Sequence, residues 1–359
     1  MLSLVFENFL SMNDKFPLIS IITPTFNSGK TIEKTLKSIR KQTYPQERIE
    51  IMIIDGGSRD DTVKIAKKYK CRVIPNLKID IINAGHLGYT KAKGKYYLGL
   101  APDEVLENPN SLKLKISAFR KDPNIRAVIA SGYKTPENMS SINHYINEFG
   151  DPFSLFYYRE SSEYTRQLSS FKKKYEVIRE DKNCAVFSFN NTEKLPPIEL
   201  WGGGNMLDLK FVRKTFPEVK INPSLIPLLF FLINTKSKLL AITKNDPTVH
   251  FSCNNLKHYL KKIKSRVEFN IFRTPMGMGG FSGRENIVKS SFKLRKYFFL
   301  FYSISIILPF LDSVILSVSR KQIVYMLHLP LSIYTSFLIG YYYLVKVFDI
   351  EHNIKLYGH

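Results

Sequence analysis

Short runs of β-branched residues alternate with amphipathic helical patterns from residue 17 to 100, and this alternation restricts the folds open to the chain. "LISIIT" (18–23) and "IEIMIID" (49–55) predict buried strands, and helical patterns follow at 28–42 and 59–69. Further strands are predicted at "CRVIP", "KIDII" and "YYLGL". Strands that alternate with helices favour an α/β fold, in which a mostly parallel sheet carries helices on both faces.

Three groups of polar residues are predicted at the carboxyl ends of these strands. "TPTFN" (23–27) follows the first strand, Asp55 closes the second, and Asp103 and Glu104 follow "YYLGL". In open sheets of this kind ligands bind beyond the carboxyl ends of the strands, so we expect the three groups to meet in one crevice. Two adjacent carboxylates repel each other unless a cation or a donor-rich ligand lies between them, which makes Asp103 and Glu104 candidates for binding such a ligand.

The length of 359 residues allows two domains, or one large α/β domain with appendages. Lys and Arg number 53 against 31 Asp and Glu, and the net charge of +22 indicates nucleic acid, a phosphate-rich substrate or an anionic membrane as partner. Cys71, Cys184 and Cys253 are too few and too scattered for a disulfide framework or a metal knuckle, which favours a reducing compartment. Residues 1–16 lack the basic start of a signal peptide and predict a short tail.

The last hundred residues differ in character. Residues 256–296 carry eleven Lys and Arg against two Glu and predict a basic linker or amphipathic region. Two apolar runs follow, at 297–319 and 322–345, and each has about the length that crosses a bilayer core. We therefore expect a membrane-associated helical hairpin over 297–345, either spanning or re-entrant, before a tail at 346–359. The alternative is a buried helical hairpin of a soluble domain.

The opening of the chain resembles a known family. "PLISIITPTFNSGKTIEKTLKSIRKQTYPQERIEIMIIDGGSRDDT" is similar to the start of the family 2 glycosyltransferases, which have the GT-A fold. "HLGYTKAKGKYYLGLAPDEVL" is similar to the next block of that family, which ends in an Asp-x-Asp metal motif, and "DPTVH" to the strand that closes its catalytic domain. The resemblance implies a GT-A domain over 17–255, a doubly wound, Rossmann-like mixed sheet. It also implies inverting transfer from a nucleoside-diphosphate sugar, with a UDP-sugar favoured.

The resemblance assigns the binding of the donor to residues of the first strands. Asp55 is expected to accept from a uracil imide or a ribose hydroxyl, and Thr23, Pro24 and Asn27 to enclose the nucleoside. His86 is expected to approach the diphosphate. The alternatives are that Asp55 caps the helix that follows and that the residues near Asn27 serve only the turn.

The resemblance also implies a metal cofactor, Mg²⁺ or Mn²⁺. Asp103 is expected to bind the cation together with two phosphate oxygens, and the cation would neutralise charge as the nucleoside diphosphate leaves. His250 is expected to be a second ligand or a diphosphate contact, and Glu104 to contact the sugar or to bind the metal through water. The alternatives are two acids on a solvated turn and a histidine that only packs.

Two departures from the family pattern affect the mechanism. Ala101 replaces the first acid of Asp-x-Asp, and "INPSLIPLLFFL" (221–232) lacks the Glu-Asp that supplies a base in many relatives. A hydroxyl acceptor needs a base, whereas a phosphate acceptor is already an anion. The chain is therefore compatible with polyprenyl phosphate as acceptor, more generally a membrane-linked acceptor such as a lipid-linked glycan. The competing explanation is that Glu199 or Asp208 supplies the base for a sugar hydroxyl.

Other function classes are less consistent with the pattern. A catalytically degenerate, membrane-bound sugar-nucleotide-binding protein stays an alternative because of Ala101 and the lost Glu-Asp. Nucleic-acid binding would explain the net positive charge but no other feature of the sequence, since the lysines concentrate beside the apolar runs. The segment "TPTFNSGK" lacks the glycine fingerprint that a dinucleotide-dependent oxidoreductase would need. We expect a membrane location, with the catalytic domain facing the cytoplasm and a role in cell-envelope polysaccharide synthesis.

Overall fold

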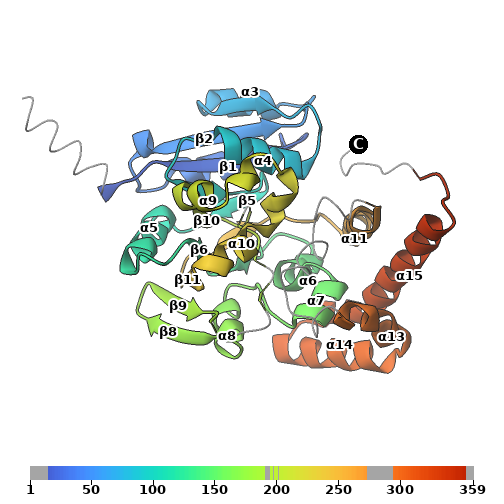
Figure 1. Cartoon of the computed structure of the whole chain (residues 1–359). Coiled ribbons are helices and arrows are strands. Elements are labelled where there is room, and N and C mark those ends of the chain that lie inside the picture. The colour runs from blue at the N-terminus through green and yellow to red at the C-terminus, as the bar shows by residue number, and fades with distance from the viewer. Residues whose placement is uncertain (1–14, 191–194, 197, 201, 273–293, 353–359) are drawn as a thin grey trace, which may run out of the picture. The chain divides into compact units, whose positions relative to one another are not determined.

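The computed structural model describes residues 15–190, 195, 196, 198–200, 202–272 and 294–352 (Figure 1). The chain forms two compact units. The first contains the described residues of 1–132, 175–190 and 198–249, and the second those of 133–174, 191–197 and 250–359. Most of the tail predicted at 1–16 and residues 273–293 of the predicted basic linker lie outside the described residues. The domain boundaries expected at 255 and 296 stay predictions.

The first unit contains a nine-stranded sheet with the order β3-β2-β1-β4-β10-β6-β11-β9-β8. Its strands are β1 (Ile19–Thr25), β2 (Ile49–Asp55), β3 (Arg72–Pro75), β4 (Tyr96–Gly99), β6 (Ala127–Ile129), β8 (Glu176–Glu180), β9 (Cys184–Ser188), β10 (Asn205–Asp208) and β11 (Leu239–Thr243). From β3 to β4 all neighbours are parallel, whereas β10 runs antiparallel to both β4 and β6. The predicted α/β class and the mixed sheet are confirmed.

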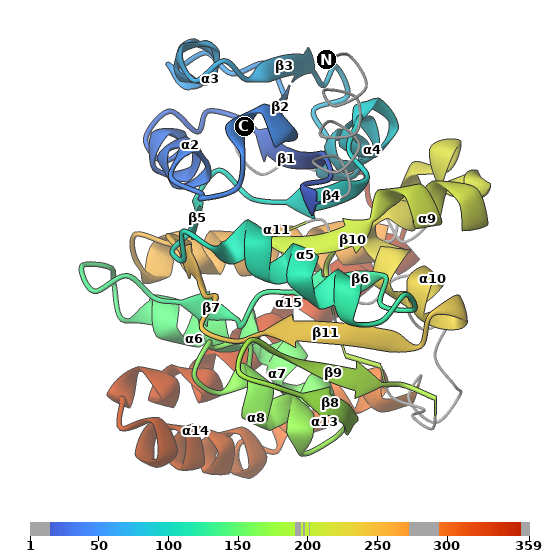
Figure 2. The same cartoon turned by 90° about the vertical axis from the view of Figure 1, so that its left-hand side faces the viewer.

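Helices cover both sides of this sheet. They are α2 (Ile32–Arg40), α3 (Thr62–Lys68), α4 (Ile81–Lys91), α5 (Ser111–Lys121), α9 (Leu209–Thr215) and α10 (Leu229–Lys236), with 3-10 turns at Gln46–Arg48, Pro217–Lys220 and Pro223–Leu228. Figure 2 shows α2 and α3 on one side of β1 and β2, and α4 on the other. Two short strands, β5 (Glu104–Leu106) and β12 (Thr248–His250), lie outside the large sheet.

The strand predicted at "KIDII" is wrong, because these residues begin a helix. The carboxylate of Asp80 accepts hydrogen bonds from Ile82 N at 2.7 Å and Asn83 N at 3.1 Å. This is the N-cap of α4, in which an acidic side chain satisfies donors that the first turn leaves without partners. The two isoleucines after Asp80 suggested a strand, but the cap determines the local structure.

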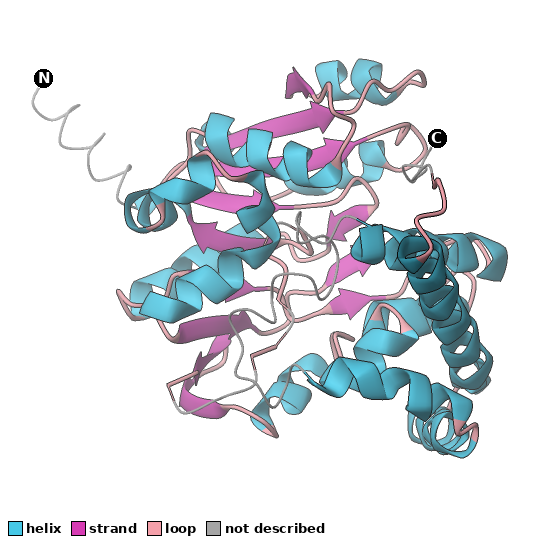
Figure 3. Ribbon diagram, turned by 45° about the vertical axis from the view of Figure 1, so that its right-hand side comes forward, coloured by secondary structure: helices cyan, strands magenta, loops and turns pink. Residues whose placement is uncertain are grey.

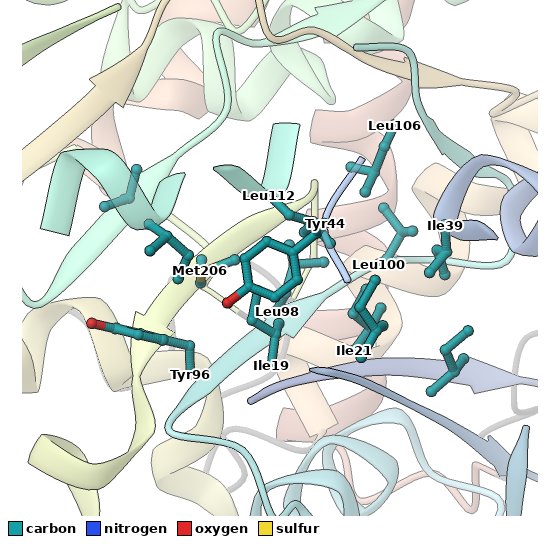
Figure 4. Close-up of a cluster of buried hydrophobic side chains, with 14 of the residues drawn as sticks. Ile19, Ile21, Ile39, Tyr44, Tyr96, Leu98, Leu100, Leu106, Leu112 and Met206 are labelled. Atoms are coloured by element: carbon teal, nitrogen blue, oxygen red, sulfur yellow. The ribbon is translucent and has the colours of Figure 1, made fainter. Parts of the chain in front are cut away.

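The core of the first unit lies between β1, β4 and the helices α2 and α5. Figure 4 shows Leu98 of β4 and Leu100 among Ile19 and Ile21 of β1, with Tyr44 nearby. All these side chains are buried. Because successive strand residues point to opposite faces, Ile19 and Ile21 share one face of β1. This packing holds the ends of β1 and β4 at fixed positions beside each other.

The second unit is mainly helical, as the cyan segments of Figure 3 show. Its helices are α6 (Ile142–Phe149), α7 (Pro152–Tyr158), α8 (Gln167–Lys172), α11 (Leu256–Phe272), α13 (Phe298–Ile304), α14 (Ile307–Arg320) and α15 (His328–Val347), with 3-10 turns at Arg295–Tyr297 and Ile323–Leu327 and the short strand β7 (Tyr133–Lys134).

The first predicted membrane run is not one helix. It breaks at Ile306, whose φ is 56°, and the helical segments Arg295–Ile304 and Ile307–Arg320 meet at 89°. The second run forms one continuous helical stretch, Ile323–Val347. In the described part of the chain this stretch alone is long and apolar enough to cross a bilayer, and the bent pair counts as a second only when it is taken as one span.

Candidate active site

The parallel strands bring the residues that are expected to bind the sugar nucleotide and its cation to one edge of the sheet. Thr25 of β1 lies beside Asp55 of β2, and Ile22 of β1 beside Gly99 of β4. Because these strands run in the same direction, their carboxyl ends lie at the same edge. The segment 23–27, Asp55 and the turn containing Asp103 therefore emerge together, as the topology rule for such sheets requires.

Asp55 is the centre of a hydrogen-bonded turn at that edge. Its Oδ1 accepts from the hydroxyls of Thr25 at 3.0 Å and Ser58 at 2.6 Å. Its Oδ2 accepts from Gly57 N at 3.0 Å and Ser58 N at 2.9 Å. The side chain is buried. These contacts fit the alternative of a structural turn residue, and the predicted contact of Asp55 with a nucleoside stays a prediction.

The loop after β1 is tied to the loop after β2. Asn27 has a φ of 47°, a left-handed conformation that Asn tolerates better than most residues. Its backbone N–H donates to Ser58 Oγ at 2.8 Å, and its Oδ1 accepts from Arg59 N at 2.9 Å. The carboxylate of Asp60 accepts from Gly29 N at 2.8 Å. The two loops therefore form one preorganised element beside β1.

Asp60 is held in its ionised form. Although partial burial raises the pKa of Asp60, hydrogen bonds from the Thr62 hydroxyl and from Gly29 N outweigh it and keep the pKa below its usual value.

Pro24 lies within β1 next to Thr23, whose buried hydroxyl has no hydrogen-bond partner in the described residues. A nearby ligand or water would satisfy that hydroxyl.

The turn after β4 is fixed by Glu104 rather than by Asp103. Glu104 is 3% exposed, and its Oε2 accepts from Ala101 N at 2.7 Å and from Gly203 N at 3.0 Å. Asp103 is half-buried in the turn that Glu104 closes. Glu104 thus joins this turn to the glycine-rich segment 202–204. We assign it a positioning role from these contacts, and its contact with sugar or metal stays a prediction.

The glycine-rich segment needs glycine for its geometry. Gly203 and Gly204 have φ values of 68° and 69°, which residues with a Cβ rarely adopt. A Cβ on Gly204 would lie 2.8 Å from Thr248 Oγ1 and 3.0 Å from Leu106 Cδ2. Gly204 N also donates to Gly99 O at 2.9 Å. The backbone of the segment therefore lies directly against the end of β4.

The two candidate bases have different surroundings. Glu199 is exposed, and its backbone carbonyl accepts from Asn205 Nδ2 at 2.9 Å. Asp208 caps α9 by accepting from Phe211 N at 2.9 Å, and it pairs with Arg126 Nη1 at 2.6 Å.

Asp208 lies away from the edge where Asp103 emerges. Since β10 runs antiparallel to β4, Asn205 lies beside Gly99 and Asp208 beside Tyr96, at the opposite end of the strand. The predicted catalytic roles of both acids stay predictions, and the geometry favours Glu199 over Asp208.

The two candidate histidines, His86 and His250, differ in which ring nitrogen carries the proton. His86, on α4, places Nε2 2.8 Å from Lys220 O, so this nitrogen carries the proton. His250 belongs to the second unit, where its Nδ1 lies 2.8 Å from Asn147 Oδ1. The amide of Asn147 donates through Nδ2 to the carbonyl of His250 at 3.3 Å, so its oxygen faces the ring. His250 therefore has its proton on Nδ1 and its lone pair on Nε2, the tautomer that binds metals through Nε2.

The described residues contain no cluster of three or more His, Cys, Asp or Glu side chains arranged to hold a metal ion. A cation at Asp103 would therefore need oxygen ligands from a bound molecule. A diphosphate supplies such hard oxygen ligands, and Mg²⁺ commonly binds through one or two carboxylates and substrate phosphates. The residues present fit a cation that arrives with a nucleotide, with Asp103 as its protein ligand.

Several contacts at the candidate site were not predicted from the sequence. The links made by Ser58 and Asp60 between two loops, and the two hydrogen bonds of Glu104, depend on strand register. The string "DGGSRDDT" contained a signal, because three acids and a serine around a double glycine are typical of a hydrogen-bonded turn. The buried pair Lys115–Asp246, with 2.5 Å between Nζ and Oδ2, had no local signal at all.

Comparisons with known proteins identify the family and the fold. Residues 20–195 match the family described as Glycosyl transferase family 2. An uncharacterized glycosyltransferase of Rickettsia prowazekii is 30% identical over 133 residues, which are 36% of this chain and 41% of that protein. A Methanococcus voltae protein is 31% identical over 134 residues, 34% of this chain and 41% of that protein. Its name is dolichyl N-acetyl-alpha-D-glucosaminyl phosphate 3-beta-D-2,3-diacetamido-2,3-dideoxy-beta-D-glucuronosyltransferase. The chain thus spans less than half the length of these two relatives.

One solved structure is similar over nearly the whole chain. It is the mannosyltransferase PcManGT from Pyrobaculum calidifontis, determined in complex with GDP-Man and Mn²⁺. The similarity has a TM-score of 0.53 at 12% identity and covers 94% of this chain and 88% of that one. At this identity the comparison supports the fold, a GT-A-like mixed sheet followed by C-terminal helices.

Proposed function

The chain is a protein of glycosyl transferase family 2 with a GT-A-like fold, and on this premise we propose that it is a metal-dependent, inverting glycosyltransferase. The donor is a nucleoside-diphosphate sugar, with a UDP-sugar favoured, and the acceptor is a membrane-linked molecule. The observation that carries this proposal is the meeting of segment 23–27, Asp55 and the Asp103 turn at the carboxyl edge of β1, β2 and β4.

The donor would lie along this edge. The linked loops at Asn27 and Ser58 present a rigid wall for a nucleoside, and the unpartnered hydroxyl of Thr23 lies just below it. His86 donates from Nε2 to Lys220 O, and its proposed role near the diphosphate would need that donor to change partner. A divalent cation bound at Asp103 would neutralise charge on the departing diphosphate, and the expected role of His250 as a ligand stays a prediction.

The transfer is a single displacement. An acceptor oxygen attacks the anomeric carbon and forms a new C–O bond, while the bond from that carbon to the β-phosphate oxygen breaks. The electron pair leaves with the nucleoside diphosphate, and the configuration inverts. When the acceptor is polyprenyl phosphate, the attacking oxygen is already anionic and no proton has to be removed.

We favour the phosphate acceptor because Asn222, Pro223 and Ser224 occupy the stretch where many relatives supply a base. The Methanococcus voltae relative is named for a dolichyl-phosphate-linked acceptor, which supports the lipid-linked class. For a lipid-linked glycan the acceptor is a hydroxyl, and its proton would pass to Glu199. Asp208 is the weaker candidate because it caps α9 at the other end of β10.

Thermal-shift measurements with UDP-, GDP- and dTDP-sugars test the donor site. We expect Mn²⁺ alone to change the unfolding temperature little, and Mn²⁺ with the correct nucleotide sugar to raise it by several degrees. Asp103→Asn should remove the Mn²⁺ effect and keep a metal-independent nucleotide effect. Asp61→Asn is the matched control, since Asp61 is exposed and pairs only weakly with Lys64.

Radiolabel transfer then identifies the acceptor. Transfer to polyprenyl phosphate that persists in Glu199→Gln supports the base-free reaction. Transfer only to a lipid-linked glycan, lost in Glu199→Gln while donor binding persists, would replace it by the hydroxyl reaction. Donor binding without any turnover would favour the alternative of a degenerate sugar-nucleotide-binding protein.

A further inference from the structure

The C-terminal helices of the second unit expose large apolar side chains. From Tyr297 to Val318, a stretch that the structure describes completely, the exposed side chains are apolar except for Ser305. They include Phe301, which is 72% exposed, and Ile315, which is 62% exposed. A helix that faces water has charged or polar residues on its outer side, and large apolar patches mark interaction surfaces.

Large apolar side chains are also exposed on α15. Its buried side is mixed and carries the polar residues His328, Ser332, Thr335 and Ser336 beside Leu331, Leu338, Tyr342 and Val345. Its outer side carries a stripe of large apolar residues at helical spacing, among them Phe337, which is 68% exposed. We name the exposed large apolar side chains of α13, α14 and α15 the outer face; they are Phe298, Phe301, Ile304, Ile307, Leu308, Phe310, Leu311, Val314, Ile315, Val318, Ile333, Phe337, Tyr341, Tyr343, Leu344 and Val347.

Charged groups of these helices are bound on the inner side. Asp312 of α14 accepts from Arg159 Nη1 at 2.7 Å. Arg320, at the end of α14, donates through Nη2 to the buried carboxylate of Glu148 at 2.7 Å, and Tyr325 donates to the same carboxylate. The charges of Asp312 and Arg320 are therefore neutralised within the unit and do not face outward.

A histidine joins two of the helices to α6. His328 lies with Nδ1 2.6 Å from Tyr145 OH and with Nε2 2.7 Å from Tyr302 OH. Its side chain is fully buried. These bonds orient α13 and α15 so that the outer face stays outward. An apolar exterior, with the polar and charged groups satisfied inside the unit, is the arrangement expected when lipid rather than water surrounds the helices.

The helix lengths and neighbours argue against a crossing of the bilayer. α14 has 14 residues, so it is roughly 21 Å long and shorter than a hydrocarbon core of about 30 Å. The helix α15 is long enough, but α11 packs along it and would have to cross as well. Phe272 of α11 lies 5.9 Å from the ring of Tyr342, and Lys346 Nζ donates to Ile271 O at 2.8 Å.

The outer side of α11 is strongly basic. Lys257, Lys261 and Lys264 are exposed and follow each other at helical spacing. Lysines are very unfavourable in hydrocarbon but are attracted to anionic headgroups at a membrane surface. The net charge of +22 acts in the same direction. This combination of an apolar face with lysines beside it fits a membrane of anionic lipids better than it fits another protein.

We propose that the outer face inserts into a single leaflet of an anionic bilayer, so that α13, α14 and α15 attach the protein without crossing the membrane. The proposal rests on the proposed function in that a membrane-linked acceptor requires such a location. It replaces the choice between a spanning and a re-entrant hairpin by a one-sided attachment. The lysines of α11 then lie at the headgroup level.

Vesicle sedimentation tests the surface with the full chain. We expect binding to vesicles of phosphatidylcholine and phosphatidylglycerol, and weaker binding to phosphatidylcholine alone. Phe310→Glu with Ile315→Glu should lower the partition coefficient at least tenfold. Ile221→Glu is the matched control, because Ile221 is 82% exposed in the first unit and lies outside the outer face. Equal binding of the double variant and the control would overturn the assigned surface.

Thiol labelling tests the one-sided attachment. Lys321→Cys and Asp349→Cys place a thiol at each end of the helical stretch that contains α15. In intact bacterial cells, a membrane-impermeant maleimide should label neither variant above the wild-type level, and after lysis it should label both. Labelling of either variant in intact cells would mean that the stretch crosses the membrane, which overturns the proposal.

Three further outcomes distinguish the membrane attachment from a dimer interface and from the proposed function. A stable dimer in vesicle-free solution that dissociates in the Phe310→Glu, Ile315→Glu variant would assign the outer face to a second copy and overturn the lipid assignment. Normal stabilisation by the nucleotide sugar without vesicle binding refutes the membrane inference alone. Vesicle binding without any nucleotide-sugar effect refutes the proposed function alone.

Discussion

Glu104 provides a direct test of whether the acid beside Asp103 acts on a ligand or on the backbone. Its Oε2 accepts two hydrogen bonds, from Ala101 N at 2.7 Å and from Gly203 N at 3.0 Å. Glu104→Ala removes the acceptor and leaves the buried N–H of Gly203 and the part-buried N–H of Ala101 without it. Glu104→Gln keeps an oxygen in the same place, and an amide oxygen has two lone pairs for the two donors. The two variants therefore separate the geometry of the side chain from its charge.

The expected magnitudes differ clearly. A buried donor without its partner costs about 1–3 kcal/mol, so Glu104→Ala should lower the free energy of unfolding by about 2–5 kcal/mol. Bonds to a neutral amide are weaker than bonds to a carboxylate, and Glu104→Gln should lose only about 1 kcal/mol. For a unit of roughly 200 residues, each kcal/mol changes the melting temperature by about 2–4 °C.

Scanning fluorimetry and turnover of the nucleotide sugar measure the two effects together. We expect Glu104→Ala to melt roughly 5–15 °C lower and to lose turnover, whereas Glu104→Gln melts within about 4 °C of the wild type and keeps its turnover within threefold. Asp103→Asn should lose turnover, because its proposed role is to bind the cation. The reasoning is refuted when Glu104→Gln melts normally but loses turnover a hundredfold, because its charge would then act on sugar or metal.

Three further predictions concern other parts of the first unit. Gly204→Ala should lower the free energy of unfolding in urea by about 1–3 kcal/mol, since φ is 69° and the new Cβ meets Thr248. In the control Gly202→Ala the new Cβ meets nothing within 4 Å, so the free energy of unfolding should change by no more than about 0.5 kcal/mol. Lys115→Met should cost about 3–5 kcal/mol because it leaves buried Asp246 uncompensated, and adding Asp246→Leu should recover most of this loss; equal stability of both variants would contradict it. Burial raises the pKa of Cys71 to about 11, so the thiol is protonated at pH 8 and should react with iodoacetamide far more slowly than in urea-unfolded protein, with the rate rising toward pH 11. Equal rates in folded and unfolded protein at pH 8 would contradict this assignment.

Local patterns predicted the first strands well because each is a run of apolar residues bounded by turn signals. β1, β2, β3 and β4 lie where the apolar runs predicted them, and the polar groups at their ends meet as a parallel sheet demands. The strand expected at "KIDII" failed because the cap formed by Asp80 was stronger than the preference of two isoleucines. The break at Ile306 also had no signal, since Ser305 and Ile306 are ordinary helix residues.

Long-range contacts account for most of what was missed at the candidate site. The role of Glu104 depends on Gly203, which is 99 residues away. The pair Lys115–Asp246 joins residues 131 positions apart, and Lys115 looked like one of many surface lysines. The inner side of the C-terminal helices was hidden in the same way, because hydropathy averages the serines and histidine of α15 with its outer aromatic residues. Residue spacing shows that a helix has an apolar face but not whether that face meets the protein core, water or lipid.

The direction of one short strand affects how mutational scans of this chain will read. β10 is four residues long, and it carries the glycine-rich turn at one end and the cap of α9 at the other. Loss of the cap at Asp208 would let the strand slip and would displace the backbone that Glu104 holds, so activity would fall although nothing near the donor had changed. A screen scored by product alone would then identify Asp208 as chemically essential. Scoring folded protein beside product would separate such mechanical dependence from participation in the reaction.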